Sequence, residues 1–193
     1  MSTGDVTALM AVLALLGSVV LAGLVVGVAV PSLRVGLRRQ LAGQGVALAT
    51  VVALVATLGS LYLSEVADFP PCRLCWFQRI AMYPLVVVLG LGALRRDAGA
   101  RLTGLVLAGL GLAVNLWHGA VEIRPSLEGS GCDPANPCSI RWVEELGFWT
   151  IPRMATVAFV LVLALLVLDR PARHPSASPG PDPRPLSQEE PVP

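Results

Sequence analysis

One uncharged stretch decides the class of fold: VTALMAVLALLGSVVLAGLVVGVAV, residues Val6–Val30, 25 residues long. An α-helix rises about 1.5 Å per residue, so about 20 apolar residues are enough to cross the hydrocarbon core of a bilayer. The stretch is too long for the core of a signal peptide, and Asp5 precedes it where a signal peptide carries basic residues. We therefore predict that Val6–Val30 is a retained transmembrane helix.

The composition of the whole chain agrees with this prediction. Of the 193 residues, 54% are hydrophobic and only 14% are charged, whereas soluble domains carry about 25% charged residues. The net charge is only +1, and no run of basic residues is long enough for a nucleic-acid-binding tail. We expect an integral membrane protein with no nucleic-acid partner.

Four more stretches downstream are long and apolar enough to cross a membrane. They are Ala42–Ser64, a helix from near Cys72 to Leu94, Leu102–Val121, and a last stretch from about Ile151 to Leu168. Short connections between neighbouring spans favour antiparallel packing. The sequence predicts an all-α integral membrane protein with an antiparallel four-helix transmembrane bundle plus one extra N-terminal span. Glycines at 90, 92, 104, 109 and 111 would allow close helix contacts, although glycine is also common in membrane helices without such a role.

The spans divide the chain into three parts. Residues 1–41 form the extra N-terminal span and a cytoplasmic turn, and residues 42–169 form the four-helix membrane domain with an outer loop at 122–150. Residues 171–193 contain eight of the sixteen prolines, together with serine and acidic residues. This composition predicts that residues 170–193 are a disordered, Pro-rich tail.

The arginines predict the orientation in the membrane, because cytoplasmic loops collect basic residues. Nine arginines lie on one side of the predicted spans and five on the other. We expect the larger set to face the cytoplasm. The protein would then lie in the cytoplasmic membrane with its N-terminus and all four cysteines on the outer side and its C-terminal tail in the cytoplasm. The cytoplasmic set is Arg34, Arg38, Arg39, Arg95, Arg96, Arg101, Arg170, Arg173 and Arg184, and the outer set is Arg73, Arg79, Arg124, Arg141 and Arg153.

The four cysteines form two close pairs, Cys72/Cys75 and Cys132/Cys138, at an oxidising face. Three interpretations compete: two structural disulfides, one four-thiolate zinc site, or a redox relay. A disulfide across Cys-x-x-Cys constrains little chain, and the gap in the second pair is wider than zinc sites usually show. The loop between the pairs is long enough for them to meet, so thiol–disulfide exchange is favoured. We expect no bound metal.

Electrons that leave a relay inside a membrane need a lipid-soluble acceptor, and quinone is the one that the membrane supplies. Arg79 shares a helix face with both Cys72 and Cys75, and an arginine within a membrane helix is usually functional. It is a candidate to bind a quinone carbonyl, against the alternative that it extends to the lipid headgroups. His118 is the second candidate, against a packing role, and Glu122 is expected to be solvated.

The segment Pro71–Pro84, PCRLCWFQRIAMYP, resembles the DsbB family of membrane disulfide-bond formation proteins, especially its BdbC-type branch. The similarity includes His118, the outer-loop cysteines and Ile151-Pro152, and it covers roughly residues 43–169. It implies a four-helix membrane bundle that reoxidises an extracytoplasmic thioredoxin-fold thiol oxidase of the DsbA or BdbD type. It also implies that the electrons pass to ubiquinone or menaquinone in the membrane.

The resemblance also implies a role for each candidate residue. Cys75 corresponds to the cysteine that contacts quinone and Cys72 to its exchange partner, while Arg79 and His118 lie by the quinone. Cys132 corresponds to the loop cysteine that the partner attacks, and Cys138 resolves the mixed disulfide. The chain departs from the family pattern in the close spacing of its loop cysteines, in residues 1–41 and in its tail.

The function hypothesis is therefore a membrane dithiol:quinone oxidoreductase that supports disulfide bond formation. One alternative is a membrane thiol reductase that runs the same relay in reverse, because direction depends on redox potentials. The other alternative is a non-catalytic membrane scaffold with a zinc-clamped outer face.

Overall fold

The computed structural model describes residues 2–169, so the predicted Pro-rich tail at 170–193 lies outside the described residues. Within residues 2–169, five helices are long and apolar enough to cross a membrane. They are α1 (Thr3–Ala29), α3 (Gly45–Glu65), α4 (Arg73–Arg95), α5 (Ala98–Ile123) and α6 (Ile151–Leu168). The predicted all-α membrane fold is confirmed.

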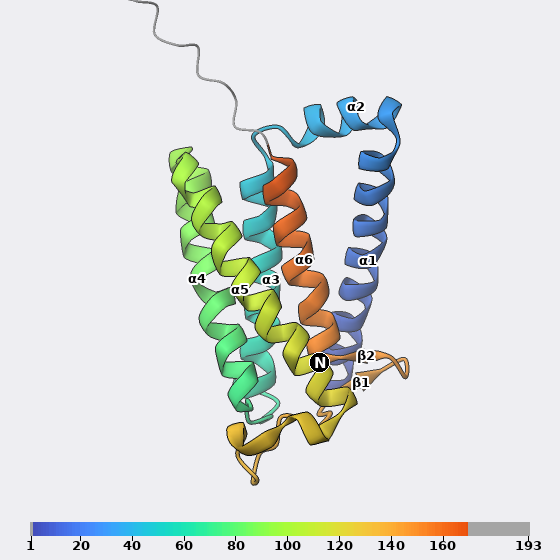
Figure 1. Ribbon diagram of the computed structural model, residues 1–193, viewed down its shortest axis with the longest axis vertical. Helices are drawn as coiled ribbons and strands as arrows, with labels where there is room; N and C mark the ends of the chain where they lie inside the picture. The colour runs from blue at the N-terminus through green and yellow to red at the C-terminus, as the bar shows by residue number, and fades with distance from the viewer. Residues whose placement is uncertain (1, 170–193) are drawn as a thin grey trace, which may run out of the picture.

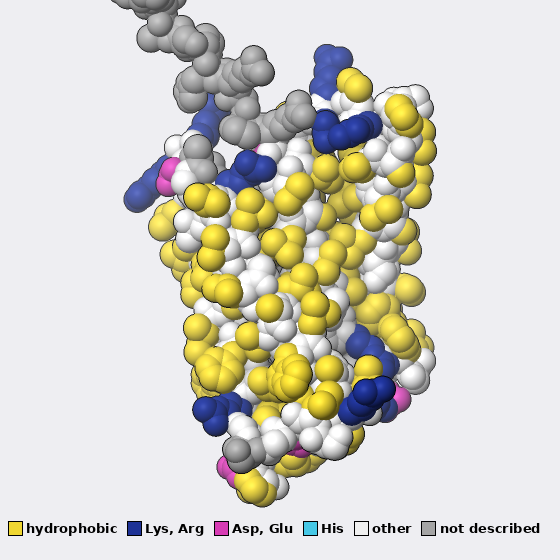
Figure 2. Space-filling view, in the orientation of Figure 1, with side chains coloured by type: hydrophobic (Ala, Val, Ile, Leu, Met, Phe, Trp, Pro, Cys, Tyr) yellow, Lys and Arg dark blue, Asp and Glu magenta, His cyan; other side chains and the backbone are white. Residues whose placement is uncertain are grey.

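The helices α3, α4, α5 and α6 form an antiparallel bundle, and α1 packs beside it, chiefly against α6 (Figure 1). In Figure 2, a broad apolar surface separates arginines at the two ends of the molecule, as expected of a protein that crosses a bilayer. At one end, the Asp169 carboxylate accepts hydrogen bonds from the backbone N–H groups of Gly43 (2.8 Å) and Val46 (3.3 Å). This bond pair ties the end of α6 to the start of α3.

The turn predicted after the first span is instead a helix, α2 (Pro31–Leu41), which crosses the end of the bundle (Figure 1). Pro31 occupies its first turn, where a missing N–H costs nothing. Its residues combine apolar side chains with basic ones, and Leu37 packs against Gly27 of α1. A short basic amphipathic helix is suited to the membrane interface.

The loop between α5 and α6 carries two short 3₁₀ helices, Pro125–Leu127 and Gly129–Gly131, and a small hairpin. Strand β1 (Glu144–Glu145) pairs antiparallel with β2 (Trp149–Thr150). Gly147 in the turn has a φ of +67°, a conformation that glycine adopts without strain. The hydroxyl of Thr7 on α1 donates to Glu145 over 2.6 Å, which fastens the hairpin to α1.

Small residues let the bundle helices approach closely around a buried core. A Cβ at Gly111 would overlap the ring of Phe159, and one at Gly104 would come within 2.6 Å of Leu89. A Cβ at Gly109, by contrast, would meet no atom within 4 Å, so the predicted packing role is wrong for this glycine. The buried core includes Ala49, Ala53, Leu85, Leu89, Ala108, Phe159, Val162 and Leu166.

We predict that Gly111→Ala destabilises the bundle, because the new methyl group displaces Phe159 from a filled site. Overpacking of this kind costs about 1–3 kcal/mol. The matched control is Gly109→Ala, which adds the same atoms on the same helix in open space. Thermal unfolding in detergent should show a lower Tm for the first variant only. Equal Tm values for the two variants would contradict this packing.

Candidate redox site

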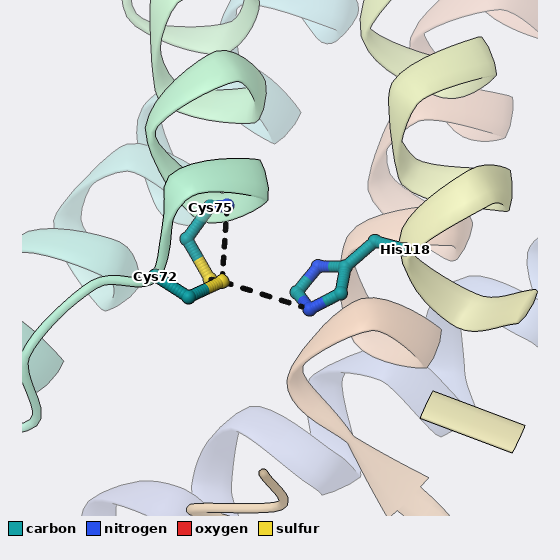
Figure 3. A group of neighbouring side chains, drawn as sticks. All are labelled: Cys72, Cys75 and His118. Atoms are coloured by element: carbon teal, nitrogen blue, oxygen red, sulfur yellow. Dashed lines mark hydrogen bonds between the residues drawn. The ribbon is translucent and has the colours of Figure 1, made fainter. Parts of the chain in front are cut away.

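The site is built on the first turn of α4. Pro70 and Pro71 end the preceding loop, and Cys72 is the N-cap residue of the helix. Its sulfur accepts the backbone N–H of Cys75 at 3.3 Å, and the two sulfur atoms lie 2.9 Å apart (Figure 3). The unpaired amides and the dipole of a helix N-terminus favour a thiolate at this position.

His118 reaches this cysteine pair from α5. Its Nε2 lies 3.8 Å from Cys72 Sγ and 3.0 Å from the carbonyl oxygen of Cys138 (Figure 3 shows the first contact). Its Nδ1 lies 2.7 Å from the amide nitrogen of Gln78. A carbonyl oxygen only accepts and an amide nitrogen only donates, so the neutral ring carries its hydrogen on Nε2. The ring therefore presents an N–H to the sulfur of Cys72.

This environment favours the ionised form of Cys72. The hydrogen bond from Cys75 and, after it, the interactions with His118 hold the pKa of the Cys72 thiol well below its usual value, although burial opposes them. Cys72 is therefore a thiolate at neutral pH in this arrangement. A thiolate is the form that attacks a disulfide.

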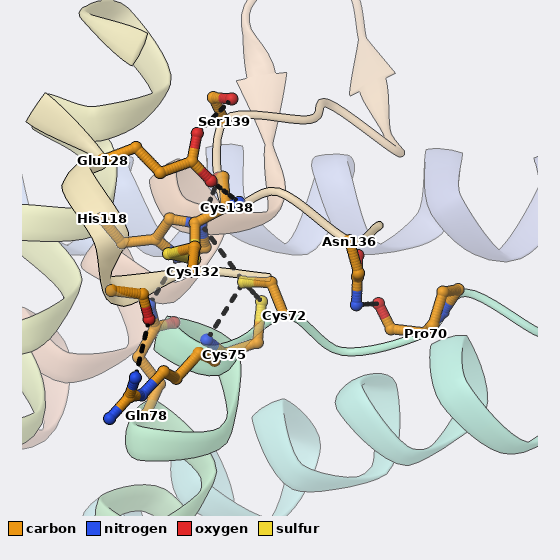
Figure 4. The surroundings of a disulfide bond; sticks show 12 residues. Pro70, Cys72, Cys75, Gln78, His118, Glu128, Cys132, Asn136, Cys138 and Ser139 are labelled. Carbon is orange, nitrogen blue, oxygen red and sulfur yellow. Dashed lines mark hydrogen bonds between the residues drawn. A yellow bond between two sulfur atoms is a disulfide. The ribbon is translucent and has the colours of Figure 1, made fainter. Parts of the chain in front are cut away.

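The second cysteine pair lies against the first. A disulfide joins Cys132 to Cys138, and both half-cystines belong to one buried cluster with Cys72, Cys75 and Val121 (Figure 4). Two side chains hold the loop there: the Arg73 guanidinium donates to the carbonyl of Gly131 at 2.9 Å, and the Asn136 amide donates to the carbonyl of Pro70 at 3.2 Å. The structure thus brings together all four cysteines that the sequence singled out.

Glu128 holds the disulfide from the loop side. One carboxylate oxygen accepts the backbone N–H of Cys138, and the other accepts the Ser139 hydroxyl at 2.9 Å (Figure 4). Because Cys138 is almost fully buried, its N–H needs this protein partner. The bond from the Cys138 N–H to Glu128 fixes Cys138, whose carbonyl oxygen contacts His118.

Two groups of side chains present metal-binding atoms within 4.8 Å of one another: Cys72/Cys75/His118 and Glu128/Cys132/Cys138. Zinc bound by the four cysteines would need four thiolates. The Cys132–Cys138 disulfide withdraws two of them. In this structure the cysteines therefore form a dithiol beside a disulfide, which is an arrangement for exchange.

Arg79 lies on another side of α4, away from His118. Its guanidinium donates to the carbonyl of Ser60 on α3 at 3.0 Å and lies 5.4 Å from the centre of the Trp76 ring. Arg79 is thus held between two helices and does not simply extend toward headgroups. The sequence placed Arg79 and His118 around one ligand, whereas the structure separates them.

Arg79 and Cys75 border a cavity of about 320 Å³ that is lined by residues of α1, α3, α4 and α6. Its walls are mostly aliphatic, and its polar side chains include Ser60, Gln78, Arg79 and Tyr83. The Tyr83 hydroxyl donates to Ser60 over 3.2 Å. His118 does not line this cavity, but Cys72, Cys75 and His118 line a much smaller pocket on the loop side.

The prediction that Glu122 is solvated is wrong. Its side chain is only 3% exposed and forms ion pairs with Arg141 (3.1 Å) and Arg153 (3.9 Å). Glu122 lies in the last turn of α5, Arg141 belongs to the loop and Arg153 to α6, so these pairs tie three segments together. Single-sequence reasoning missed this because the partners lie 19 and 31 positions away.

Sequence reasoning also missed Gln78 and Glu128. Gln78 is buried in a membrane helix, three positions after Cys75. Polar residues are rare in such helices, so its presence in the span was the signal that the sequence offered. Glu128 gave no such signal, because an acidic residue in an outer loop is ordinary.

A buried dithiol at a helix N-terminus, a disulfide against it and five apolar helices together define an integral membrane thiol–disulfide redox protein. A sequence model described as "Disulfide bond formation protein DsbB" matches residues 39–168. The chain belongs to this DsbB family, and it is a multi-pass membrane protein with a role in disulfide bond formation.

Curated relatives agree with this assignment. The chain is 42% identical over 120 residues to the "Probable disulfide formation protein" of Oceanobacillus iheyensis. This aligned region covers 61% of this chain and 83% of the relative. The chain is 41% identical over 119 residues to the "Disulfide bond formation protein C" of Bacillus subtilis, covering 61% and 86%. No solved structure matches the chain significantly.

We predict that His118→Phe raises the pH at which Cys72 becomes reactive. The ring of phenylalanine lacks the Nε2–H that faces the thiolate, so the Cys72 pKa moves up toward its usual value. Each unit of that shift lowers the thiolate fraction about tenfold at a pH below the midpoint. Iodoacetamide alkylation of Cys72 in the reduced protein, followed by mass spectrometry from pH 4 to 9, measures the midpoint. Trp117→Phe is the control, and identical profiles for the two variants would refute this role.

We also predict that Glu122→Ala loosens the loop between α5 and α6. Arg141 loses its buried partner, and a loss of about 1 kcal/mol raises the open fraction of the loop about fivefold. Trypsin cleavage after Arg141 should then accelerate by about that factor. Glu65→Ala is the control, because Glu65 is exposed and its carboxylate accepts a hydrogen bond from the neighbouring Ser64 hydroxyl. Cleavage at the wild-type rate would show that the ion pairs do not hold the loop.

Proposed function

We propose that this protein is a dithiol:quinone oxidoreductase that reoxidises an extracytoplasmic thioredoxin-fold thiol oxidase. The observation that carries the proposal is the position of Cys75. Its side chain borders both the cysteine cluster on the loop side and the apolar cavity among the helices. This position supports a role in which Cys75 receives electrons from thiols on one side and releases them on the other.

In the first step, a thiolate of the reduced partner attacks a sulfur of the Cys132–Cys138 disulfide. Cys132 is the better target, because it is partly exposed whereas Cys138 is buried. Cys138 leaves as a thiolate, and the second partner thiol then displaces Cys132 from the mixed disulfide. The partner gains a disulfide, and the loop pair gains two electrons and two protons.

In the second step, the reduced loop pair attacks a Cys72–Cys75 disulfide. The loop disulfide re-forms, and Cys72 and Cys75 become the dithiol. The arrangement in the structure corresponds to the end of this step, with Cys132–Cys138 bonded and Cys72 and Cys75 free. The Nε2–H of His118 stabilises Cys72 as a thiolate leaving group.

The cavity fits a quinone by its chemistry. Its volume of about 320 Å³ lies within the range of small-molecule sites. Arg79 and Tyr83, which both donate to Ser60, supply a cluster of polar groups in the same cavity as Cys75, and the remaining walls suit an apolar ring and side chain. A bound quinone would supply a two-electron, two-proton acceptor, so that Cys72 and Cys75 return to the disulfide. Arg79 would hold and polarise a carbonyl oxygen.

The proposed location is the cytoplasmic membrane, with the cysteines on the outer side and the C-terminal tail in the cytoplasm. The distribution of arginines supports this orientation. The cysteine end of the bundle carries the long loop with its disulfide, and disulfides persist in oxidising compartments. The end with α2 carries Arg34 and Arg39.

We predict that purified wild-type protein reduces a soluble ubiquinone analogue when it is given a reduced thioredoxin-fold oxidase. Cys75→Ser should lower this rate at least about a thousandfold, because the Cys72–Cys75 disulfide can no longer form. Ser18→Ala, on α1 and far from the cysteines in sequence, is the control. Quinone reduction by Cys75→Ser at the wild-type rate would overturn the proposed mechanism.

The direction of electron flow is tested by the redox potentials of the two pairs. Electron flow toward quinone requires each acceptor to have a higher reduction potential than its donor. For a two-electron couple, a difference of about 30 mV corresponds to about 1.4 kcal/mol. Potentials in the opposite order would instead favour a thiol reductase.

A further inference from the structure

We propose that α1, the helix outside the family match at 39–168, forms one wall of the quinone cavity. We further propose that the isoprenoid side chain of the quinone leaves the cavity between α1 and α3. The inference rests on the proposed function, because it assigns the path of the quinone that the Cys75 site would use. It gives the extra span a role in selecting the acceptor.

The first argument is the position of α1. Met10, Leu13 and Ala14 of α1 line the same cavity as Cys75 and Arg79. A Cβ at Gly17, the next position on that face, would lie 2.8 Å from Val157 of α6, so glycine lets α1 seat closely against α6. The helix is thus a packed wall and not a loosely associated span.

The second argument is the opening between α1 and α3. On α1, Leu13 lines the cavity yet remains 42% exposed, and on α3 the cavity residues Val51 and Val55 are 57% and 44% exposed. Side chains that face both the cavity and the outside mark a lateral opening. Its walls are aliphatic on both helices, so a hydrocarbon chain can pass through it into the lipid.

The third argument is the polarity of the cavity along its length. The polar groups Ser60, Arg79 and Tyr83 gather at the Cys75 end, whereas Val51 lies nine positions before Ser60 on α3. Nine residues of helix span about 13 Å. A ligand with a polar head and a long apolar tail matches this order, with its head at the cysteine and its tail directed toward the middle of the membrane.

The ligand class that follows is a quinone with an isoprenoid side chain. Met10 also packs against α3, since a Cβ at Gly59 would lie 2.9 Å from the Met10 methyl group. This contact closes the outer end of the gap between α1 and α3. The tail must therefore leave deeper in the membrane, beside Leu13.

The test uses Leu13→Trp in the full-length protein, which places a bulky ring in the opening. Leu15→Trp is the matched control: it makes the same substitution two positions away, and Leu15 is exposed and does not line the cavity. The probe is a ubiquinone analogue with a photoreactive diazirine on its side chain. Mass spectrometry locates the labelled residues, and the KM is measured for the same quinone and for one without a side chain.

We expect labelling of α1 around Leu13 and of α3 around Val51 in the wild-type protein and in Leu15→Trp. Leu13→Trp should reduce that labelling at least fivefold. It should also raise the KM at least tenfold for the long-chain quinone, and much less for the quinone without a tail. The rate of thiol exchange between Cys132–Cys138 and a reduced partner reports that the variant is folded.

Labelling that spares α1, or equal effects of the two tryptophan variants, would overturn the assignment of α1. These results differ from a failure of the proposed function itself. In that case the wild-type protein would neither reduce quinone nor be labelled specifically by the photoreactive analogue.

Discussion

Thiol–disulfide exchange with another protein takes place at a water-facing surface, whereas the lipid-soluble electron acceptor proposed above stays in the apolar layer. The first turn of α4 meets both requirements, because Cys72 faces His118 and the loop while Cys75 also borders the cavity. The two residues stand three positions apart at a helix N-terminus, where the amides favour thiolate. The rest of the structure positions groups around this turn.

The polar contacts at the cysteine end of the bundle serve that arrangement. Gln78 fixes the hydrogen of His118 on Nε2, and Glu128 holds Cys138 through its backbone N–H. Glu122 fastens the loop to α6 through Arg141 and Arg153. Such buried polar groups are costly in a membrane protein unless they are paired. Their concentration at one end of the bundle indicates that the loop is docked against α4, so that the two cysteine pairs meet.

Much of this could be predicted from the sequence, because apolar stretches and cysteine spacing are local signals. The five spans and the four cysteines follow from them directly. The separation of Arg79 from His118 could not be predicted, since it depends on how α4 rotates between α3 and α5. The burial of Glu122 depends likewise on distant arginines. The helix α2 was missed because eleven residues are too few to show periodicity clearly.

The central claim is that Cys72 and Cys75 stand between the loop disulfide and the acceptor in the membrane. The most direct measurement starts with fully reduced protein, adds one equivalent of quinone without oxygen, and traps thiols at successive times by alkylation and mass spectrometry. We predict that a Cys72–Cys75 disulfide appears first and that Cys132–Cys138 forms at its expense. Formation of Cys132–Cys138 at an unchanged rate in a Cys72→Ser/Cys75→Ser variant would contradict the claim.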